Sequence, residues 1–451
     1  MPSDPQPVAL VDEGLGNSSY LVDLGNGRAL ALDPERDPGP YLAAAEQHGL
    51  AIAYSVETHL HADFVSGSRE LAARGAQVLA SAAGGIEFPH RGLDDGDEVD
   101  LGGLTLRALA TPGHTPEHLS YLLLDDRRPI GLFSGGSLLV GSVARTDLIA
   151  PERTESLARA LWRSLHERIL TLPDDLPVYP THGAGSFCSA PVGGERTTTI
   201  GAEKRANPLL AAPDEDAFVK LLLAGLGSYP TYFLRMREVN RQGPTVYGPV
   251  TCALPALSVD QVRPLLDAGA TLVDVRPIAS FAGGHIPGAL SIELRPAFAT
   301  WLGWLAEPER DLVFVLDPDQ DRVDLVRQAH NVGYERLVGE LAGGMAAWES
   351  ARLPVDRISL VAAAEMTGPV LDLRQNSEFE AGHVPSALHV ELGALTDAFD
   401  AGGITVMCGH GERAMTGASL LARAGRRGVV VALGGPDDWA VAHHHPLHTG
   451  R

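Results

Sequence analysis

The best-placed nucleophile in the sequence is Cys408, which follows a short apolar run at 403–407 and precedes a helix-forming stretch at 414–424. An apolar run of this length predicts a buried strand, so we expect the cysteine in a tight loop between that strand and the helix. The N–H groups of such a loop, together with the helix dipole, stabilise an anion. We therefore expect the thiol to react as a thiolate and to carry sulfur as a persulfide.

Four residues separate Cys408 from Arg413, and the pattern Cys-x-x-Gly-x-Arg resembles the active-site loop of rhodanese sulfurtransferases. The related phosphatases and arsenate reductases have a longer loop, which makes a wider cradle for a tetrahedral oxyanion. The resemblance implies that Cys408 is the sulfur carrier and that Arg413 binds an anionic donor. It also implies that the donor contacts the remaining loop residues, which are Gly409, His410, Gly411, Glu412 and Ala414.

Histidines in the first half of the chain form a second group that could do chemistry. His59, His61 and Asp63 lie at single-residue spacing directly after an apolar run, which suits a metal site. His114 and His182 each follow an apolar run in a loop of their own. Four histidines in strand-end loops favour a metal site over four unrelated core residues.

The elements around these histidines alternate between short apolar runs and helical patterns. We expect paired strands at 17–22 and 29–33, a helix at 41–48 and a strand at 52–56. In this order the motifs resemble the metallo-β-lactamase superfamily, and specifically its glyoxalase II and persulfide dioxygenase branch, over about residues 8–245. The segments that carry the resemblance are 17–22, 58–63, 111–116, 144–148 and 199–208.

This resemblance implies an αβ/βα sandwich with the metal site at one edge of two sheets. Persulfide dioxygenases of this family bind one iron through two histidines and an aspartate, a set suited to Fe(II) and oxygen. The resemblance implies that His59 and His114 correspond to the two histidines. The family's Thr-Gly-Asp motif corresponds here to residues 134–136, so Gly136 stands where the carboxylate is expected. Phe64 likewise replaces a histidine that binds the second metal in glyoxalase II.

Two interpretations of this altered site stay open. In the first, the metal site is degenerate and the domain is a scaffold or a thiol-binding module. In the second, His59, His61 and His114 form a three-histidine site like that of zinc hydratases, or a weakened iron site. Asp63 and His182 are further candidate ligands. We accordingly expect Fe(II) or Zn(II) to be bound weakly or not at all.

The second half of the chain contains an internal repeat. The segment 272–276 recurs at 371–374. Corresponding residues of the two copies differ in number by 98 at first, and this offset becomes 91 near the end of each copy. The repeated pattern resembles the rhodanese domain, and we interpret its shared Asp, Arg and His residues as structural. At the offset of 91, Asp317 corresponds to Cys408 and Arg322 to Arg413. Because a carboxylate cannot carry sulfane sulfur, we expect the first copy to be inactive.

Glycine–proline pairs near 243–249 mark the boundary before this repeat. We expect an α/β protein with an N-terminal metallo-β-lactamase sandwich and two rhodanese domains. The expected bounds are 1–248 for the metallo-β-lactamase/persulfide dioxygenase-like domain, 256–355 for the inactive rhodanese-like domain and 358–451 for the active one.

Composition limits the classes of partner. Lys and Arg number 35 against 57 Asp and Glu, and the net charge of −22 argues against nucleic acid and against anionic membranes. We find no leader pattern in the first 25 residues and no apolar run long enough to span a bilayer, so we expect a cytoplasmic protein. Cys188 and Cys252 lack the glycine–arginine context of Cys408 and are interpreted as structural. Homo-oligomerisation is left open.

The whole chain resembles bacterial fusions of a persulfide dioxygenase domain, an inactive rhodanese domain and an active rhodanese domain. The resemblance implies sulfane-sulfur transfer through a Cys408 persulfide, with a low-molecular-weight thiol persulfide, thiosulfate or sulfite as partner. Gly136 implies an impaired dioxygenase-like domain. Two alternatives stay open, namely a bifunctional persulfide dioxygenase–sulfurtransferase that retains a histidine-bound metal, and a non-catalytic persulfide carrier or docking protein.

Overall fold

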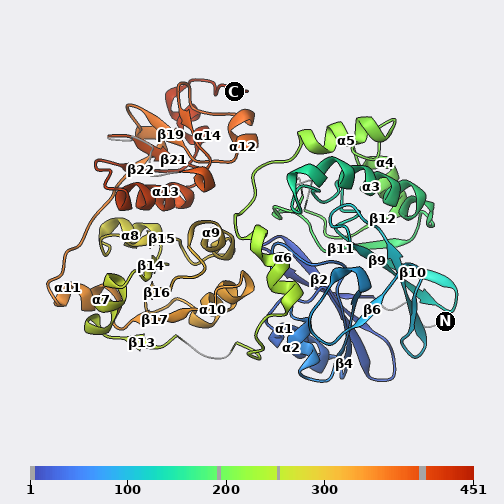
Figure 1. The fold of residues 1–451 in the computed structure, drawn as a ribbon. Coiled ribbons are helices and arrows are strands. Elements are labelled where there is room, and N and C mark those ends of the chain that lie inside the picture. The colour runs from blue at the N-terminus through green and yellow to red at the C-terminus, as the bar shows by residue number, and fades with distance from the viewer. Residues whose placement is uncertain (1–5, 190–193, 251–253, 396–402, 451) are drawn as a thin grey trace. The chain divides into compact units, whose positions relative to one another are not determined.

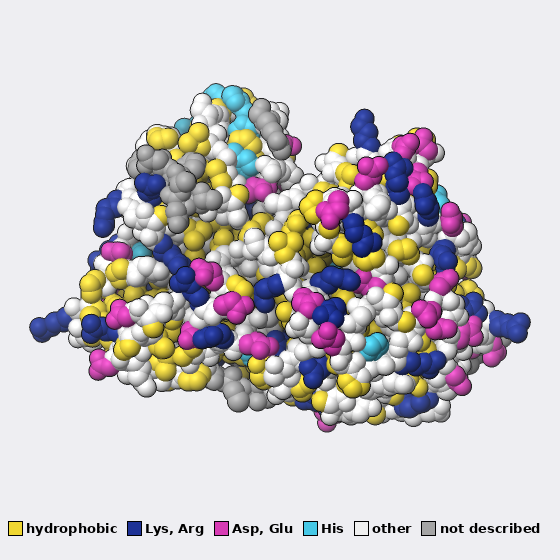
Figure 2. Space-filling model, viewed as in Figure 1, with side chains coloured by type: hydrophobic (Ala, Val, Ile, Leu, Met, Phe, Trp, Pro, Cys, Tyr) yellow, Lys and Arg dark blue, Asp and Glu magenta, His cyan; other side chains and the backbone are white. Residues whose placement is uncertain are grey.

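The computed structural model describes residues 6–189, 194–250, 254–395 and 403–450 (Figure 1). The chain divides into two compact units, one of residues 1–251 with 327–333 and the other of residues 252–326 with 334–451. Among the described residues, no helix is both long enough and apolar enough to cross a membrane. On the face drawn in Figure 2, acidic and basic side chains are interspersed, in keeping with the absence of a basic stretch in the sequence.

Unit 1 contains two six-stranded sheets within its described residues. The first sheet is antiparallel from β1 to β3 and parallel from β3 to β6, and it confirms the predicted pairing of 17–22 with 29–33 because Tyr20 lies opposite Leu32. Its strands, in spatial order, are β1 (Val8–Asp12), β2 (Asn17–Asp23), β3 (Arg28–Leu32), β4 (Ala51–Val56), β5 (Gln77–Ser81) and β6 (Arg91–Leu93).

The second sheet is antiparallel except where β10 and β11 run parallel. Its strands, in spatial order, are β12 (Thr198–Thr199), β11 (Pro177–Pro180), β10 (Arg128–Gly135), β9 (Leu119–Asp125), β8 (Leu104–Ala110) and β7 (Glu98–Asp100). The helices of this unit are α1 (Gly39–Gln47), α2 (Ser68–Ala72), α3 (Thr154–Glu167), α4 (Ile200–Ala206), α5 (Glu215–Ala224) and α6 (Phe233–Gln242).

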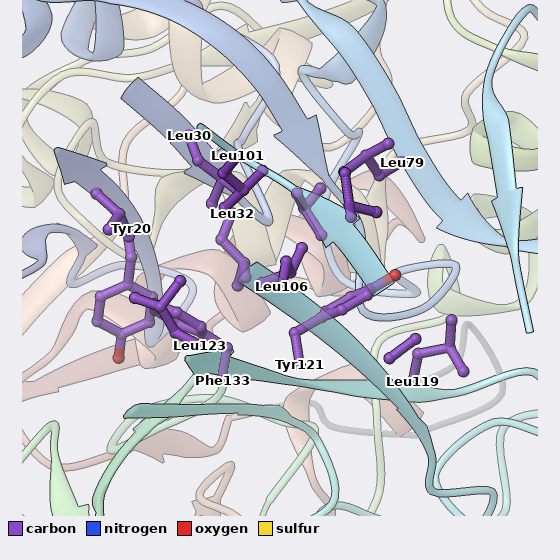
Figure 3. Close-up of a cluster of buried hydrophobic side chains, with 14 of the residues drawn as sticks. Tyr20, Leu30, Leu32, Leu79, Leu101, Leu106, Leu119, Tyr121, Leu123 and Phe133 are labelled. Carbon is purple, nitrogen blue, oxygen red and sulfur yellow. The ribbon is translucent and has the colours of Figure 1, made fainter. Parts of the chain in front are cut away.

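A hydrophobic core fills the space between these two sheets (Figure 3). Alternate residues of the strands face this core, so Leu30 and Leu32 of β3 belong to the same cluster as Tyr121 and Leu123 of β9. Each fully buried side chain of this size contributes about 1.5–3 kcal/mol. The opposite faces pack against helices, the first sheet against α1 and α2 and the second against α3 and α5. This is the αβ/βα sandwich that the sequence predicts.

Unit 2 contains two five-stranded sheets in its described part, and every strand pair in them is parallel. Both sheets have the same strand order, which confirms the internal repeat. The first sheet runs β13 (Ala256–Leu257), β17 (Leu337–Leu341), β16 (Leu312–Val315), β14 (Thr271–Asp274) and β15 (Leu290–Ser291). The second runs β18 (Ser359–Ala362), β22 (Val430–Leu433), β21 (Thr405–Met407), β19 (Val370–Asp372) and β20 (Leu388–His389).

The central strands of unit 2 are continuous apolar runs, as expected for parallel strands that are covered on both faces. Helices connect the strands because a parallel connection must cross back over the sheet. These helices are α7 (Val259–Asp267), α8 (Ile278–Gly283), α9 (Phe298–Leu305), α10 (Arg322–Asn331), α11 (Gly344–Ser350), α12 (Asn376–Ala381), α13 (Glu412–Arg423) and α14 (Pro436–His443).

Candidate functional site

Cys408 lies directly after β21 and is buried, with 1% of its surface exposed. The following helix α13 begins at Glu412, two residues earlier than the sequence predicts, so the loop is tighter than expected. The backbone N–H of Gly411 donates a hydrogen bond to Sγ of Cys408 at 3.1 Å. Gly411 has a φ of +124°, which explains the glycine at this turn. The loop therefore points a donor at the sulfur, as an anion cradle requires.

Arg413 is fixed by a two-point ion pair with Glu378, at 2.6 Å and 2.8 Å. Burial alone would lower the pKa of Arg413, but the Glu378 carboxylate and Cys408 raise it. Burial likewise favours a higher pKa for Glu378, yet its hydrogen bonds from Arg413 lower the pKa below the usual value. Both groups are therefore charged. Sequence analysis missed Glu378, which lies 35 residues before its partner.

A cavity of about 240 Å³ opens onto Cys408 and is lined by residues of both repeats. The second repeat contributes the predicted loop residues His410, Glu412 and Arg413 with the cysteine. The first repeat contributes three residues that the sequence did not indicate, namely Arg295, Ala297 and Trp301. Their signal is weak because none belongs to a motif shared by the two copies.

Contacts between the repeats explain how these residues reach the cavity. The N–H of Ser291 in β15 donates to Oγ of Ser419 in α13 at 3.1 Å. Trp301 stacks on Trp304, with ring centroids 5.2 Å apart and an interplanar angle of 10°. A Cβ at Gly393 would come within 2.0 Å of Trp304, so this glycine lets the tryptophan approach the second repeat. The inactive copy thus forms one wall of the cavity.

The equivalent loop of the first repeat is closed by its own side chains. The N–H of Asp317 donates to the amide oxygen of Gln320 at 2.9 Å, and its carboxylate accepts from Ser280 at 3.1 Å. Arg322 donates to the carbonyl oxygens of Asp317, Pro318 and Gln320 and forms an ion pair with Glu340. These contacts use the groups that would otherwise bind an anion.

The two other cysteines differ from Cys408. Cys188 is fully buried, and burial together with the nearby Asp63 carboxylate raises the pKa of its thiol well above the usual value. Such a thiol is a poor nucleophile. Cys252 lies outside the described residues.

His59, His114 and His182 come together in unit 1, from the loops after β4, β8 and β11. One nitrogen of each ring lies within 4.8 Å of the other two, and all three residues are buried. Nε2 of His59 is 3.4 Å from Nε2 of His182. Burial and the neighbouring imidazoles lower the pKa of His59 well below its usual value and that of His114 to about 3, so both rings are neutral.

His61 lies beside this group, with its ring centroid 4.2 Å from that of His59, and belongs to two other groups of candidate ligands. Its Nε2 lies 3.1 Å from Glu57 and 3.3 Å from Asp33, so these two buried carboxylates orient the imidazole ring. Burial alone would lower the pKa of His61, but Asp33 and Glu57 raise it to about 10. The ring is therefore a cation. Sequence analysis missed Asp33 and Glu57 because neither belongs to the histidine motif.

Asp63 stands beside the group, with one carboxylate oxygen 3.2 Å from Nδ1 of His182. Burial alone would raise the pKa of Asp63, but His182 lowers it below the usual range. Among the described residues, neither oxygen of Asp63 has a hydrogen-bond partner. The carboxylate thus faces an imidazole that already belongs to the three-histidine group.

Comparison with known proteins agrees with this architecture. Residues 3–182 match the metallo-beta-lactamase superfamily, and residues 258–351 and 359–442 each match the rhodanese-like domain. The human mitochondrial persulfide dioxygenase ETHE1 is 33% identical over 208 residues, which cover 45% of this chain and 75% of that protein. The chain belongs to the metallo-beta-lactamase superfamily. Its C-terminal half carries tandem rhodanese-like domains, which indicate a sulfurtransferase.

Two further relatives extend the comparison. A hydroxyacylglutathione hydrolase of Rhodopseudomonas palustris (strain BisB18) is 30% identical over 249 residues, which cover 49% of this chain and 93% of that protein. A metallo-beta-lactamase structure from Staphylococcus aureus subsp. aureus COL has 30% identity and a TM-score of 0.65. The match covers 75% of this chain and 99% of that one, so it is longer than unit 1 and includes part of unit 2.

The backbone at Gly136 lies close to two imidazoles. A Cβ at Gly136 would lie 2.6 Å from Cδ2 of His114, so the imidazole occupies the space that a side chain at this position would need. The N–H of Gly136 donates to Nε2 of His118 at 3.0 Å. His118, which the sequence analysis missed, stacks on His59 with centroids 5.1 Å apart. Buried imidazoles thus lie on more than one side of Gly136.

Proposed function

We propose that the chain transfers sulfane sulfur through a persulfide on Cys408, in the metabolism of thiosulfate and low-molecular-weight thiol persulfides. The observation that carries this proposal is the N–H of Gly411 aimed at the buried sulfur, at the end of a cavity of about 240 Å³. An anion there is stabilised by the loop donor and by the start of α13. The predicted substrate contacts at residues 409–412 and 414 belong to this proposal.

The proposed reaction has two steps that follow thiol–disulfide exchange. The Cys408 thiolate attacks the outer sulfur of thiosulfate, an S–S bond forms on the cysteine, and the S–S bond of thiosulfate breaks to release sulfite. An acceptor thiolate or cyanide then attacks the outer sulfur of the persulfide, which returns the cysteine as a thiolate. A thiol persulfide donor reacts in the same way and leaves as its thiolate.

Arg413 and Arg295 have different roles in this proposal. Glu378 fixes Arg413 through two hydrogen bonds, so this guanidinium offers the donor a positioned but partly neutralised charge. Arg295 lines the same cavity from the inactive repeat and adds a second cation. We therefore assign recognition of the donor's oxyanion to both arginines, and the sulfur itself to the loop donor.

We expect Arg295→Ala to raise KM for thiosulfate about tenfold, since one charge-assisted contact is lost, with kcat nearly unchanged. Arg295→Lys should restore most of the affinity. Arg310→Ala is a matched control in the same repeat, because Arg310 pairs with Glu307 and does not line the cavity. Steady-state kinetics with thiosulfate and cyanide measure all three variants. An equal loss of kcat in Arg295→Ala and Arg295→Lys would contradict the assignment.

The first repeat is expected to have no transferase activity of its own. In a Cys408→Ser background, Asp317→Cys should not restore turnover. Gln320 and Arg322 already form hydrogen bonds with the backbone N–H and carbonyl oxygen of residue 317, so these groups are not available to a donor. Thiocyanate formation from thiosulfate and cyanide measures this directly. Turnover above that of Cys408→Ser alone would show that the first loop can open.

We further propose three domains with the bounds 1–248, 256–355 and 358–451, the first of them impaired as a persulfide dioxygenase. The lost carboxylate at position 136 supports the impairment. The test of the main proposal is turnover by the full-length chain. Steady formation of thiocyanate or of a new thiol persulfide supports an enzyme, whereas a persulfide that forms on the protein and is never passed on would favour a carrier.

A further inference from the structure

The three buried histidines of unit 1 have lone pairs that converge on one point. Nδ1 of His114 lies 2.7 Å from the carbonyl oxygen of Arg145, and a carbonyl can only accept, so the proton is on Nδ1. Nε2 of His114 then carries the lone pair, and it has no hydrogen-bond partner among the described residues. An unpaired buried nitrogen is costly, which makes this atom the first sign of a missing ligand.

The same argument assigns the proton on His182. Its Nδ1 lies 3.0 Å from the amide oxygen of Asn17 and 3.2 Å from Asp63, and both of these are acceptors. Nε2 of His182 is therefore a lone-pair nitrogen. Fixing one ring nitrogen by a hydrogen bond is how proteins present the other to a metal.

His59 is oriented through a hydroxyl. Thr58 donates its hydroxyl proton to Asp33 at 2.7 Å, so its oxygen accepts from Nδ1 of His59 at 2.8 Å. The lone pair of His59 is then also on Nε2. This nitrogen faces Nε2 of His182 at 3.4 Å, although neither can donate to the other. Two lone pairs at this distance repel unless a cation lies between them.

The chemistry of the donors indicates which cation fits. The three ligand atoms are imidazole nitrogens that lie within 4.8 Å of one another, and Gly136 supplies no carboxylate. Imidazole suits zinc, whereas the usual non-haem Fe(II) site adds a carboxylate to two histidines.

We propose that His59, His114 and His182 form a three-histidine Zn(II) site in place of the iron site of the persulfide dioxygenase family. Three protein ligands and one open position are the composition of catalytic zinc sites, which activate water, rather than of structural ones. The domain would then support hydrolytic or hydration chemistry. This inference is independent of sulfur transfer at Cys408.

Two neighbouring groups differ in how they relate to this site. The set His61, Asp63 and His182 shares His182 with it, and Nδ1 of His61 and both oxygens of Asp63 have no hydrogen-bond partner among the described residues, so His114→Gln, which leaves that set intact, separates the two. The set Asp33, Glu57 and His61 is an ion pair whose carboxylates accept hydrogen bonds from threonine and serine hydroxyls. His118 is also satisfied, since its Nε2 accepts from Gly136 and its Nδ1 lies 2.9 Å from Thr111.

The test uses the full-length protein, stripped with a chelator and supplied anaerobically with one equivalent of Zn(II), Fe(II) or Co(II). We expect one zinc per chain to be retained after gel filtration, iron to be lost, and Co(II) to give the intense visible bands of a tetrahedral site. His182→Ala and His114→Gln should each weaken zinc binding at least about 100-fold. Replacing His443, His444 and His445 in the exposed tail with alanine controls for stray binding and should change nothing.

Four outcomes would overturn the proposal. They are stoichiometric iron in preference to zinc, an octahedral Co(II) spectrum, zinc binding that survives both histidine variants, and loss of zinc in the tail variant. The spectrum of the unmodified protein decides the geometry even if a histidine variant fails to fold. Sulfur transfer measured on the same samples reports separately on Cys408, so a failure of either claim is distinguishable.

Discussion

Cys408→Ser abolishes sulfur transfer from thiosulfate to cyanide, with an expected loss of kcat on the order of 10³-fold or more, because no covalent intermediate can form. A serine hydroxyl keeps the size of the side chain and can still accept from Gly411, so the fold should be unchanged. Initial rates of thiocyanate formation measure the loss. Cys188→Ser is the matched control, since that thiol is buried and its raised pKa disfavours the thiolate.

This pair of variants separates two explanations. If Cys408→Ser retained turnover and Cys188→Ser lost it, the sulfur carrier would lie in unit 1 and the rhodanese-like repeat would be a scaffold. If both variants were active, the chain would not use a cysteine persulfide in the described part of the protein.

Oxygen uptake with glutathione persulfide is expected to stay at background for the unmodified chain, on the order of 10² times or more below that of a persulfide dioxygenase with its carboxylate ligand. The lost anionic ligand disfavours Fe(II), and the three neutral imidazoles favour zinc. An oxygen electrode measures uptake, with metal analysis on the same sample. Stoichiometric iron with rapid oxygen consumption would contradict this account.

Gly136→Asp looks like a simple restoration when only the sequence is considered, but the structure changes the expectation. A Cβ at this position would lie 2.6 Å from Cδ2 and 2.9 Å from Cγ of His114, at a cost of about 1–3 kcal/mol. We expect the variant to lose zinc without gaining oxygen uptake. Gly136→Ala introduces the same Cβ without a carboxylate and should lose zinc equally. Iron and oxygen uptake gained only in Gly136→Asp would show that the ring can move aside.

The parts of the site that could be predicted from the sequence are those whose signal is local. The Cys408 loop is a continuous segment, and strand, glycines and arginine all fall within eleven residues of the chain at 403–413. The repeat was visible because the two copies keep constant offsets, and the shared strand order confirms it. The histidines of unit 1 were found for the same reason, as each ends an apolar run.

The partners of these residues could not be predicted, because tertiary packing brings them together. His61 belongs to the metal-type motif but pairs with Asp33 and Glu57, whose own motifs carry no metal signal. His118 belongs to the site because its ring stacks on His59. Arg295 lines the cavity at Cys408 because the two repeats are in contact. A sequence pattern gives the residue types at a site. The orientation of each side chain and the tautomer of each histidine depend on neighbours that are far away along the chain.

The most direct test of the central claim is the location of the transferred sulfur. The protein is incubated with thiosulfate, freed of donor and alkylated, and its intact mass and peptide masses are then measured. We predict a gain of the mass of one sulfur atom on the unmodified chain, located on the peptide that contains Cys408 and removed by cyanide. No added sulfur, or sulfur located on Cys188 or Cys252, would contradict the assignment of Cys408 as the sulfur carrier.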